Sequence, residues 1–152
     1  MTPDNVFAFL YPSICSWMKT GMQAHVTRDR VIEPFMKFGN ATRQQALEAF
    51  SYGSLPKVKS FSVDGYGDIP GNEKGWTAPG TEIIWIREDL CKKAEEKLAG
   101  GADRPARQFE ITLLHELVHW SHHEHGMPTN ARGKELRGEM GRRFERRVYR
   151  LP

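Results

Sequence analysis

The stretch Leu113-Leu114-His115-Glu116-Leu117-Val118-His119-Trp120 decides how the chain is interpreted. Its apolar residues recur at helical spacing, and proline before it and glycine after it are typical of helix ends. The sequence therefore predicts one helix over residues 105–125, with Asp103 as its N-cap. One face should pack into a core and carries Phe109, Leu113, Leu117 and Trp120. The opposite face should look into a cleft and carries His115, His119 and His122.

The two histidines of the quoted stretch have the spacing of metal ligands. On a helix, His115 and His119 lie one turn apart and about 40° apart around the axis. Two imidazoles so placed can bind one Zn²⁺ at about 2.0–2.1 Å each. Glu116 can place its carboxylate beside a water on that ion. The HExxH motif serves to bring these three side chains together. The pattern predicts His115 and His119 as zinc ligands and Glu116 as a catalytic residue.

The third protein ligand is left open among three residues. His125 has the spacing of the last histidine in the metzincin pattern, but His122 occupies the position of the glycine that lets that chain turn. Glu139 lies level with the midpoint of the histidine pair if the last two helices form an antiparallel hairpin centred on residue 128. Glu145 is the third candidate, and either glutamate can instead orient a ligand histidine. The hairpin geometry favours Glu139.

Three protein ligands would leave one position for water, as in catalytic zinc sites. The ion lowers the pKa of that water toward about 7, and Glu116 accepts the proton as general base. The predicted reaction is peptide-bond hydrolysis. Tyr149 is the preferred donor to the oxyanion, with His122 and Tyr66 as alternatives. The strand 81–87 could pair with an extended peptide substrate.

The length of 152 residues and an apolar fraction of 39% fit one domain spanning 1–152. We expect a helical N-terminal part over 1–55 and a catalytic core over 56–152. The N-terminal part should contain helices 28–37 and 43–52, the second capped by Thr42. Further expected elements are strands 58–63 and 81–87 and helices 88–98 and 131–149.

Composition excludes several classes of protein. The two cysteines, Cys15 and Cys91, cannot form a cysteine-rich metal cage or a disulfide scaffold. The longest apolar stretch, around residues 6–11, is too short to span a bilayer, and nothing around it resembles a Sec signal. From Pro128 onward there are eight Lys and Arg residues against three Glu. We interpret this basic segment as a solvated helix face and do not expect nucleic acid as a partner.

Two segments resemble a known family. Residues 113–120 are similar to the zinc helix of bacterial metallopeptidase toxins, the catalytic domains of polymorphic toxins and type VI secretion effectors. The run Glu139-Met140-Gly141-Arg142-Arg143-Phe144-Glu145, followed by Tyr149, resembles the E-x-G-x-x-F-E and downstream tyrosine of that family. With the strand and helix at 81–98, the resemblance covers roughly residues 60–150.

The resemblance implies an α+β, zincin-like fold, mostly helical with a small β-sheet, in which the HExxH helix packs against a C-terminal helix. It also implies zinc, and it supports a glutamate from 139–145 as third ligand, making the peptidase gluzincin-like. The implied role is an antibacterial toxin that acts on protein or peptide substrates. Such a toxin would reach the periplasm or cytoplasm of a target cell by a non-Sec route, with an immunity protein and a secretion-spike (VgrG) or Rhs carrier as partners.

Two other hypotheses fit the residues. One is a housekeeping zinc peptidase that acts on nucleic-acid-bound proteins through the basic C-terminal helix. The other is a non-catalytic binding domain stabilised by zinc, in which Glu116 has no chemical role.

Overall fold

The chain forms an α+β fold, mostly helical with a small sheet, as the sequence predicts. The computed structural model describes residues 1–26, 28–126 and 137–150. Its helices are α1 (Asn5–Leu10), α2 (Pro12–Lys19), α3 (Gly21–Val26), α4 (Asp29–Phe38), α5 (Arg43–Phe50), α6 (Glu88–Ala99), α7 (Arg107–Glu124) and α8 (Arg137–Tyr149). Its strands are β1 (Thr2–Pro3), β2 (Lys57–Phe61), β3 (Gly65–Tyr66), β4 (Ile69–Pro70), β5 (Gly75–Thr77) and β6 (Ile83–Arg87).

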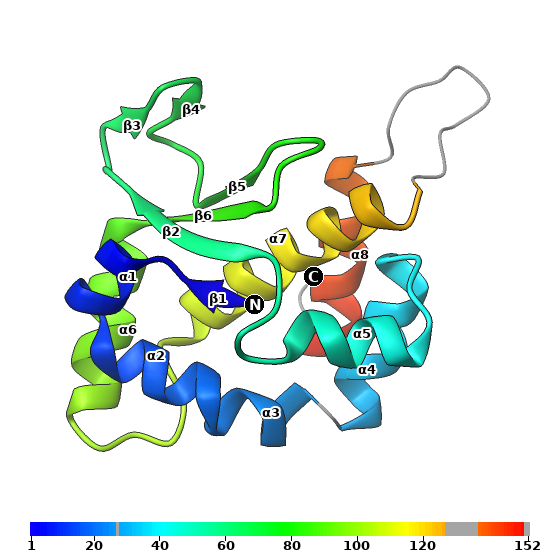
Figure 1. Ribbon diagram of the computed structural model, residues 1–152, viewed down its shortest axis with the longest axis horizontal. Helices are drawn as coiled ribbons and strands as arrows, with labels where there is room; N and C mark the ends of the chain where they lie inside the picture. Colours follow the sequence, from blue (N-terminus) through cyan, green and yellow to red (C-terminus); the bar gives the residue numbers. More distant parts are fainter. Residues whose placement is uncertain (27, 127–136, 151–152) are drawn as a thin grey trace.

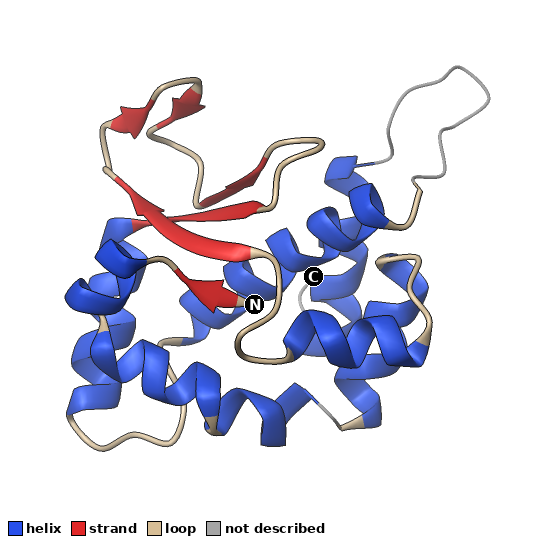
Figure 2. Cartoon of the chain, in the orientation of Figure 1, coloured by secondary structure: helices blue, strands red, loops and turns tan. Residues whose placement is uncertain are grey.

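The main sheet has the strand order β1-β2-β6-β5. Strands β1, β2 and β6 run parallel, and β5 is antiparallel to β6. Strands β3 and β4 form a separate hairpin that projects beyond the sheet (Figure 2). Because β6 pairs with β2 on one side and β5 on the other, the predicted substrate-pairing edge at 81–87 is wrong. The strands at the two edges of the sheet are β1 and β5.

Helix α7 crosses the molecule and contacts most of its layers. It packs against β5 and β6 and also against α4, α6 and α8 (Figure 1). Nearly every side chain from Phe109 to His122 is buried, and His115 is the exception. The prediction of an open face is right for His115, which lines a cleft, and wrong for His119 and His122, which are buried. His122 forms a hydrogen bond with the backbone of Phe38 at the end of α4. On another side of the helix, Ser121 donates a hydrogen bond to the carbonyl of Gly39 at 2.8 Å.

Most helix boundaries agree with the sequence analysis. Thr42 caps α5 through a capping box with Gln45, as predicted for its cap position. The predicted N-cap at Asp103 is wrong: α7 begins later, with Ala106 in the N-cap position and no side-chain cap. The preceding segment instead folds back, so that Arg104 reaches Glu110 in the first turn of α7. The residues predicted to begin the last helix at 131 lie outside the described residues.

An aromatic cluster joins the N-terminal helices to the last helix. Phe35 of α4 lies 4.6 Å from Phe50 of α5 and 6.3 Å from Phe144 of α8, measured between ring centroids. All three side chains are fully buried. The expected N-terminal part and catalytic core therefore share one hydrophobic cluster. Within the described ranges, no helix has the length and apolar character needed to cross a membrane.

We expect Phe35→Ala to lower the free energy of unfolding by about 3–5 kcal/mol, because it leaves a cavity between α4, α5 and α8. Phe9→Ala is the matched control, since Phe9 is 84% exposed, and it should change stability by less than about 0.5 kcal/mol. Urea denaturation monitored by tryptophan fluorescence measures both. Equal losses in the two variants would contradict the role of the aromatic cluster.

Candidate metal centre

Helix α7 brings the two predicted ligand histidines together. The Nε2 atoms of His115 and His119 lie 2.9 Å apart, and their rings are 4.7 Å apart between centroids. A neutral imidazole has one N–H and one lone pair, so two facing ring nitrogens either share a hydrogen or offer both lone pairs to one cation. The distance fits both a shared hydrogen and two lone pairs directed at one cation. The groups around His115 decide which of its nitrogens carries the hydrogen.

Glu145 of α8 fixes the orientation of His115. Its Oε1 lies 2.7 Å from Nδ1 of His115, and both side chains are largely shielded from solvent. A carboxylate only accepts hydrogen bonds, so in the neutral ring Nδ1 carries the hydrogen and Nε2 presents its lone pair. This is the carboxylate–histidine contact that orients metal ligands and raises their basicity. This contact is the one expected if Glu145 orients His115, a role that the sequence analysis left open for it.

Gly141 packs closely against the ring of His115. A Cβ at this position would lie 2.4 Å from Nε2 of His115, 2.5 Å from Cε1 and 2.7 Å from Cδ2, which places it over the face of the ring. Only a residue without a side chain lets α8 approach this face while the ring keeps its orientation. In an antiparallel pair centred on residue 128, position 141 is the partner of position 115, so this contact has the predicted hairpin register.

Glu116 points toward the sheet, beside the histidine pair. Its side chain is 7% exposed, and Oε2 accepts a hydrogen bond of 2.9 Å from the hydroxyl of Thr77 on β5. The same hydroxyl also lies 3.2 Å from the backbone carbonyl of Glu116. A Cβ at Gly75 would lie 2.7 Å from Cγ of Glu116. Strand β5 can therefore approach α7 closely, and Thr77 holds the carboxylate in one orientation.

A cleft opens in front of these groups, between β5 and the α7–α8 pair. Its volume is about 390 Å³. His115, Glu116 and Glu145 line it together with residues of the segment before and within β5 and of both helices: Asn72, Glu73, Lys74, Gly75, Gln108, Ile111, Thr112 and Arg142. The general-base candidate, one ligand histidine and its orienting carboxylate therefore face the same accessible space.

The described residues contain two of the expected donors but no complete ligand set. No group of three or more His, Cys, Asp and Glu side chains within them is arranged to hold a metal ion. Glu139 lies in the first turn of α8, but its side chain is outside the described residues. The lone pair on Nε2 of His115 and the second imidazole at 2.9 Å fit a bound cation. A full ligand set needs one more donor.

The other sequence-predicted residues lie elsewhere. Nδ1 of His125 lies 3.2 Å from the side-chain amide of Gln45 on α5. His122 is buried, and burial lowers its pKa. Tyr66 is exposed on the β3–β4 hairpin and stacks near Trp85, with ring centroids 5.0 Å apart. None of these three lines the cleft.

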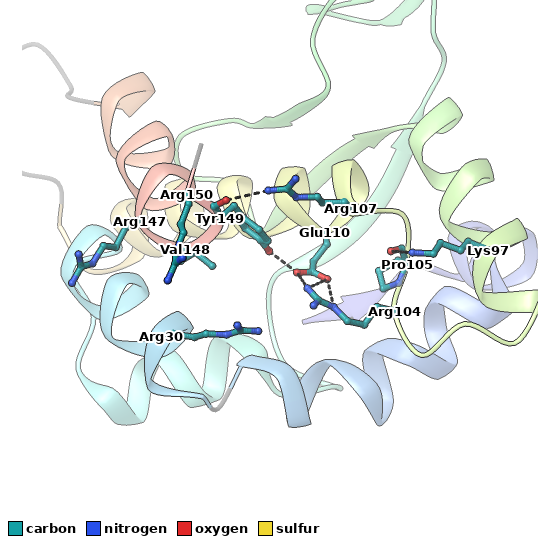
Figure 3. A pocket seen from close by; sticks show the side chains of 10 residues that line it. All are labelled: Arg30, Lys97, Arg104, Pro105, Arg107, Glu110, Arg147, Val148, Tyr149 and Arg150. Atoms are coloured by element: carbon teal, nitrogen blue, oxygen red, sulfur yellow. Dashed lines mark hydrogen bonds and ion pairs between the residues drawn. The ribbon is translucent and has the colours of Figure 1, made fainter. Parts of the chain in front are cut away.

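Tyr149 also lies away from the histidine pair. Its hydroxyl donates a 2.6 Å hydrogen bond to Glu110, and its ring lines a different pocket (Figure 3). Burial, followed by the nearby Glu110 carboxylate, raises the pKa of this hydroxyl. The structure therefore gives Tyr149 a partner in the first turn of α7 rather than a place in the cleft.

Sequence reasoning missed Thr77 and Gly75. Both belong to a three-residue strand, too short for an alternation pattern to reveal, and a threonine in a glycine-rich segment carries no signal of contact with a helix. The sequence analysis included Gly141 in the run 139–145 but assigned it no role. The close approach that each glycine permits depends on tertiary packing.

Comparisons with known proteins place the chain in a family. A family model described as metallopeptidase toxin 3 matches residues 7–150. The match includes most of the N-terminal part, where the sequence analysis found no resemblance. Neither the curated proteins nor the solved structures contain a significant match.

We expect Gly141→Ala to displace His115, because the new Cβ would collide with its ring. Zinc affinity, measured by competition with a chromogenic chelator, should fall at least about tenfold. Gly100→Ala is the matched control, since its added Cβ meets ordinary contacts at 3.4 Å and 3.5 Å. Unchanged zinc affinity in folded Gly141→Ala protein would show that this glycine is not needed to keep His115 in a zinc-binding orientation.

Proposed function

The chain belongs to the metallopeptidase toxin 3 family, and from this premise we propose that it is a zinc-dependent peptidase that hydrolyses peptide bonds in proteins of a target cell. The family name indicates a metallopeptidase and a toxin. Zinc, the residues of the site and the antibacterial role are the parts that we add.

One observation carries the proposal: the facing Nε2 atoms of His115 and His119, 2.9 Å apart, lie beside a buried glutamate that follows the first histidine. Imidazole nitrogens are good ligands for Zn²⁺, and HExxH places both of them on one side of a helix. Glu145 supports the proposal from the far side of the His115 ring, because it directs the lone pair of Nε2 toward His119.

The register of α7 and α8 sets the level of Glu139, the proposed third ligand, although at about 100° per residue this position lies on a different side of α8 from Gly141 and Glu145. Gly141 faces the ring of His115, and position 139, one residue pair further along the same antiparallel register, is level with position 117, between the two histidines. The carboxylate of Glu145 contacts Nδ1 of His115, on the opposite side of the ring from Nε2. Glu145 therefore orients a ligand, and Glu139 completes a gluzincin-like set.

Bound zinc would act as a Lewis acid toward the substrate carbonyl and lower the pKa of a water. Glu116 accepts a proton from the attacking water and transfers it to the leaving amine. The hydrogen bond from Thr77 to Oε2 of Glu116 limits rotation of the carboxylate, and the Glu116 side chain lines the cleft. Burial keeps bulk water from competing for these contacts.

An extended substrate would pair with β5. This strand lies at one edge of the sheet and pairs only with β6 among the described strands. Because β5 also contacts Glu116 through Thr77, a peptide added to its outer side would run along the cleft that Glu116 and His115 line. This strand takes the role that the sequence analysis assigned to residues 81–87.

The toxin role extends the family name to a biological setting. We propose delivery into a competing bacterium by a non-Sec route, with a carrier such as a secretion spike or Rhs protein and an immunity protein in the producer. We propose that the sheet and helices of this chain are arranged as in zincins, which suits peptide hydrolysis. The housekeeping peptidase remains an alternative that salt-dependent DNA binding would favour.

We expect Glu116→Gln to keep its zinc and lose roughly 10²–10⁴-fold in peptide hydrolysis, because the amide cannot accept the proton. Glu124→Gln is the matched control, since this exposed glutamate lies on the same helix, and it should retain full activity. Cleavage of a quenched fluorescent casein and zinc content by atomic absorption measure the two properties. Unchanged toxicity and hydrolysis in zinc-loaded Glu116→Gln would refute the general-base role and favour the non-catalytic binding domain.

Zinc content separates the two glutamates of α8. Glu139→Ala should lose most of its zinc because a ligand is removed. Glu145→Ala should retain zinc with about 10–100-fold lower affinity, because only the orientation of His115 is affected. Zinc is quantified after dialysis against a graded series of chelator concentrations. Equal retention in both variants would reject the glutamate assignment and restore His125 as a candidate.

A further inference from the structure

A second hollow lies at the other end of the α7–α8 pair. Its volume is about 620 Å³, within the range of small-molecule sites. It is lined by the start of α4, the end of α6, the loop before α7, the first turn of α7 and the end of α8 (Figure 3). The site thus collects side chains from separate parts of the sequence, which the fold alone brings together.

The lining of this hollow is strongly positive. Six described residues of the lining carry a positive charge: Arg30, Lys97, Arg104, Arg107, Arg147 and Arg150. Among the described residues that line it, Glu110 alone carries a carboxylate. Arg104 donates to this carboxylate from Nη2 at 2.6 Å and 2.8 Å and from Nε at 3.1 Å. Tyr149 donates to it at 2.6 Å.

Among the described residues, the other cations of the lining form no ion pair with a carboxylate. Arg107 and Lys97 donate to backbone carbonyls, those of Tyr149 and Pro105, which leaves their positive charges uncompensated. Like charges gathered in a concave site repel each other, so this arrangement favours a bound anion.

Helix α7 adds to the positive electrostatic potential of the hollow. It begins at Arg107 beside the hollow, and its N-cap, Ala106, offers no side-chain acceptor to the first backbone N–H groups. The N-terminus of an 18-residue helix carries a partial positive charge. The helix end alone would not define a site, but here it faces the same space as the arginines.

We propose that this hollow binds a small polyanion that carries two or more phosphate groups. Guanidinium groups recognise phosphate by paired, charge-assisted hydrogen bonds, and the several arginines here come from four different parts of the fold. A neighbouring hollow shares Arg30, Arg147 and Arg150 but adds the carboxylates Asp29 and Glu33. The excess positive charge is therefore concentrated on the first hollow, which suits a compact ligand better than an extended nucleic acid.

Binding there should stabilise the α7–α8 pair. A polyanion that contacts Arg107 at the start of α7 and Arg147 at the end of α8 would hold the two helices together at the end opposite His115 and Glu145. The thermal midpoint should therefore rise with ligand concentration, because the ligand binds the folded state alone. This consequence does not depend on peptidase activity.

The test uses tripolyphosphate as the probe and isothermal titration calorimetry at low ionic strength. The chain should bind it saturably with a stoichiometry near one. Arg30→Gln combined with Arg147→Gln should weaken binding at least about tenfold; both side chains are exposed, so the fold should persist. The control combines Arg43→Gln with Lys93→Gln, two exposed positions outside the hollow, and it lowers the net charge equally.

Each outcome decides the proposal. Loss of binding in the first double variant with retention in the control supports a built polyanion site. Equal weakening in both would show that net charge alone attracts the probe, and the proposal would be wrong. Saturable binding of duplex DNA with no binding of tripolyphosphate would overturn it in favour of a nucleic-acid surface, and so would full binding by the Arg30, Arg147 variant.

Discussion

The hydrogen bond between Glu145 and Nδ1 of His115 is the contact on which the site depends. It joins α8 to α7 at 2.7 Å, and it determines which nitrogen of the imidazole is free to bind a cation. A histidine that could turn its ring would present either nitrogen, or neither, toward His119. The orientation of the site is therefore set by a residue thirty positions away, which makes the packing of α7 against α8 a chemical requirement as well as a structural one.

The opposite end of the same helix pair has its own polar contact. Arg104 and Tyr149 both bind the buried carboxylate of Glu110, which is 1% exposed. Burying this charge would be costly without partners, and two donors from either side offset that cost. The aromatic cluster of Phe35, Phe50 and Phe144 packs α8 against the N-terminal helices α4 and α5. The relative position of α7 and α8 is thus fixed at both ends and along its length.

The sequence alone could predict those features that depend on local spacing. The histidine pair follows from the helical repeat, and the α7–α8 register follows from an antiparallel pair centred on residue 128, which places position 141 opposite His115. The role of Glu145 could not be chosen in advance, because Glu139 and Glu145 flank the apolar stripe of α8 at similar angles. The edge position of β5 and its contact through Thr77 depend on the whole sheet. The covered face of α7 depends on helices that lie more than sixty residues earlier in the chain.

Two glycines lie on either side of the site, Gly75 against Glu116 and Gly141 against His115. Neither can take part in proton transfer or donate a ligand atom, yet each keeps open a volume that a single methyl group would fill. Tolerance to substitution at these two positions should therefore resemble that of chemically active residues. A scan of substitutions along this chain would consequently find these two glycines as sensitive to replacement as the functional groups themselves.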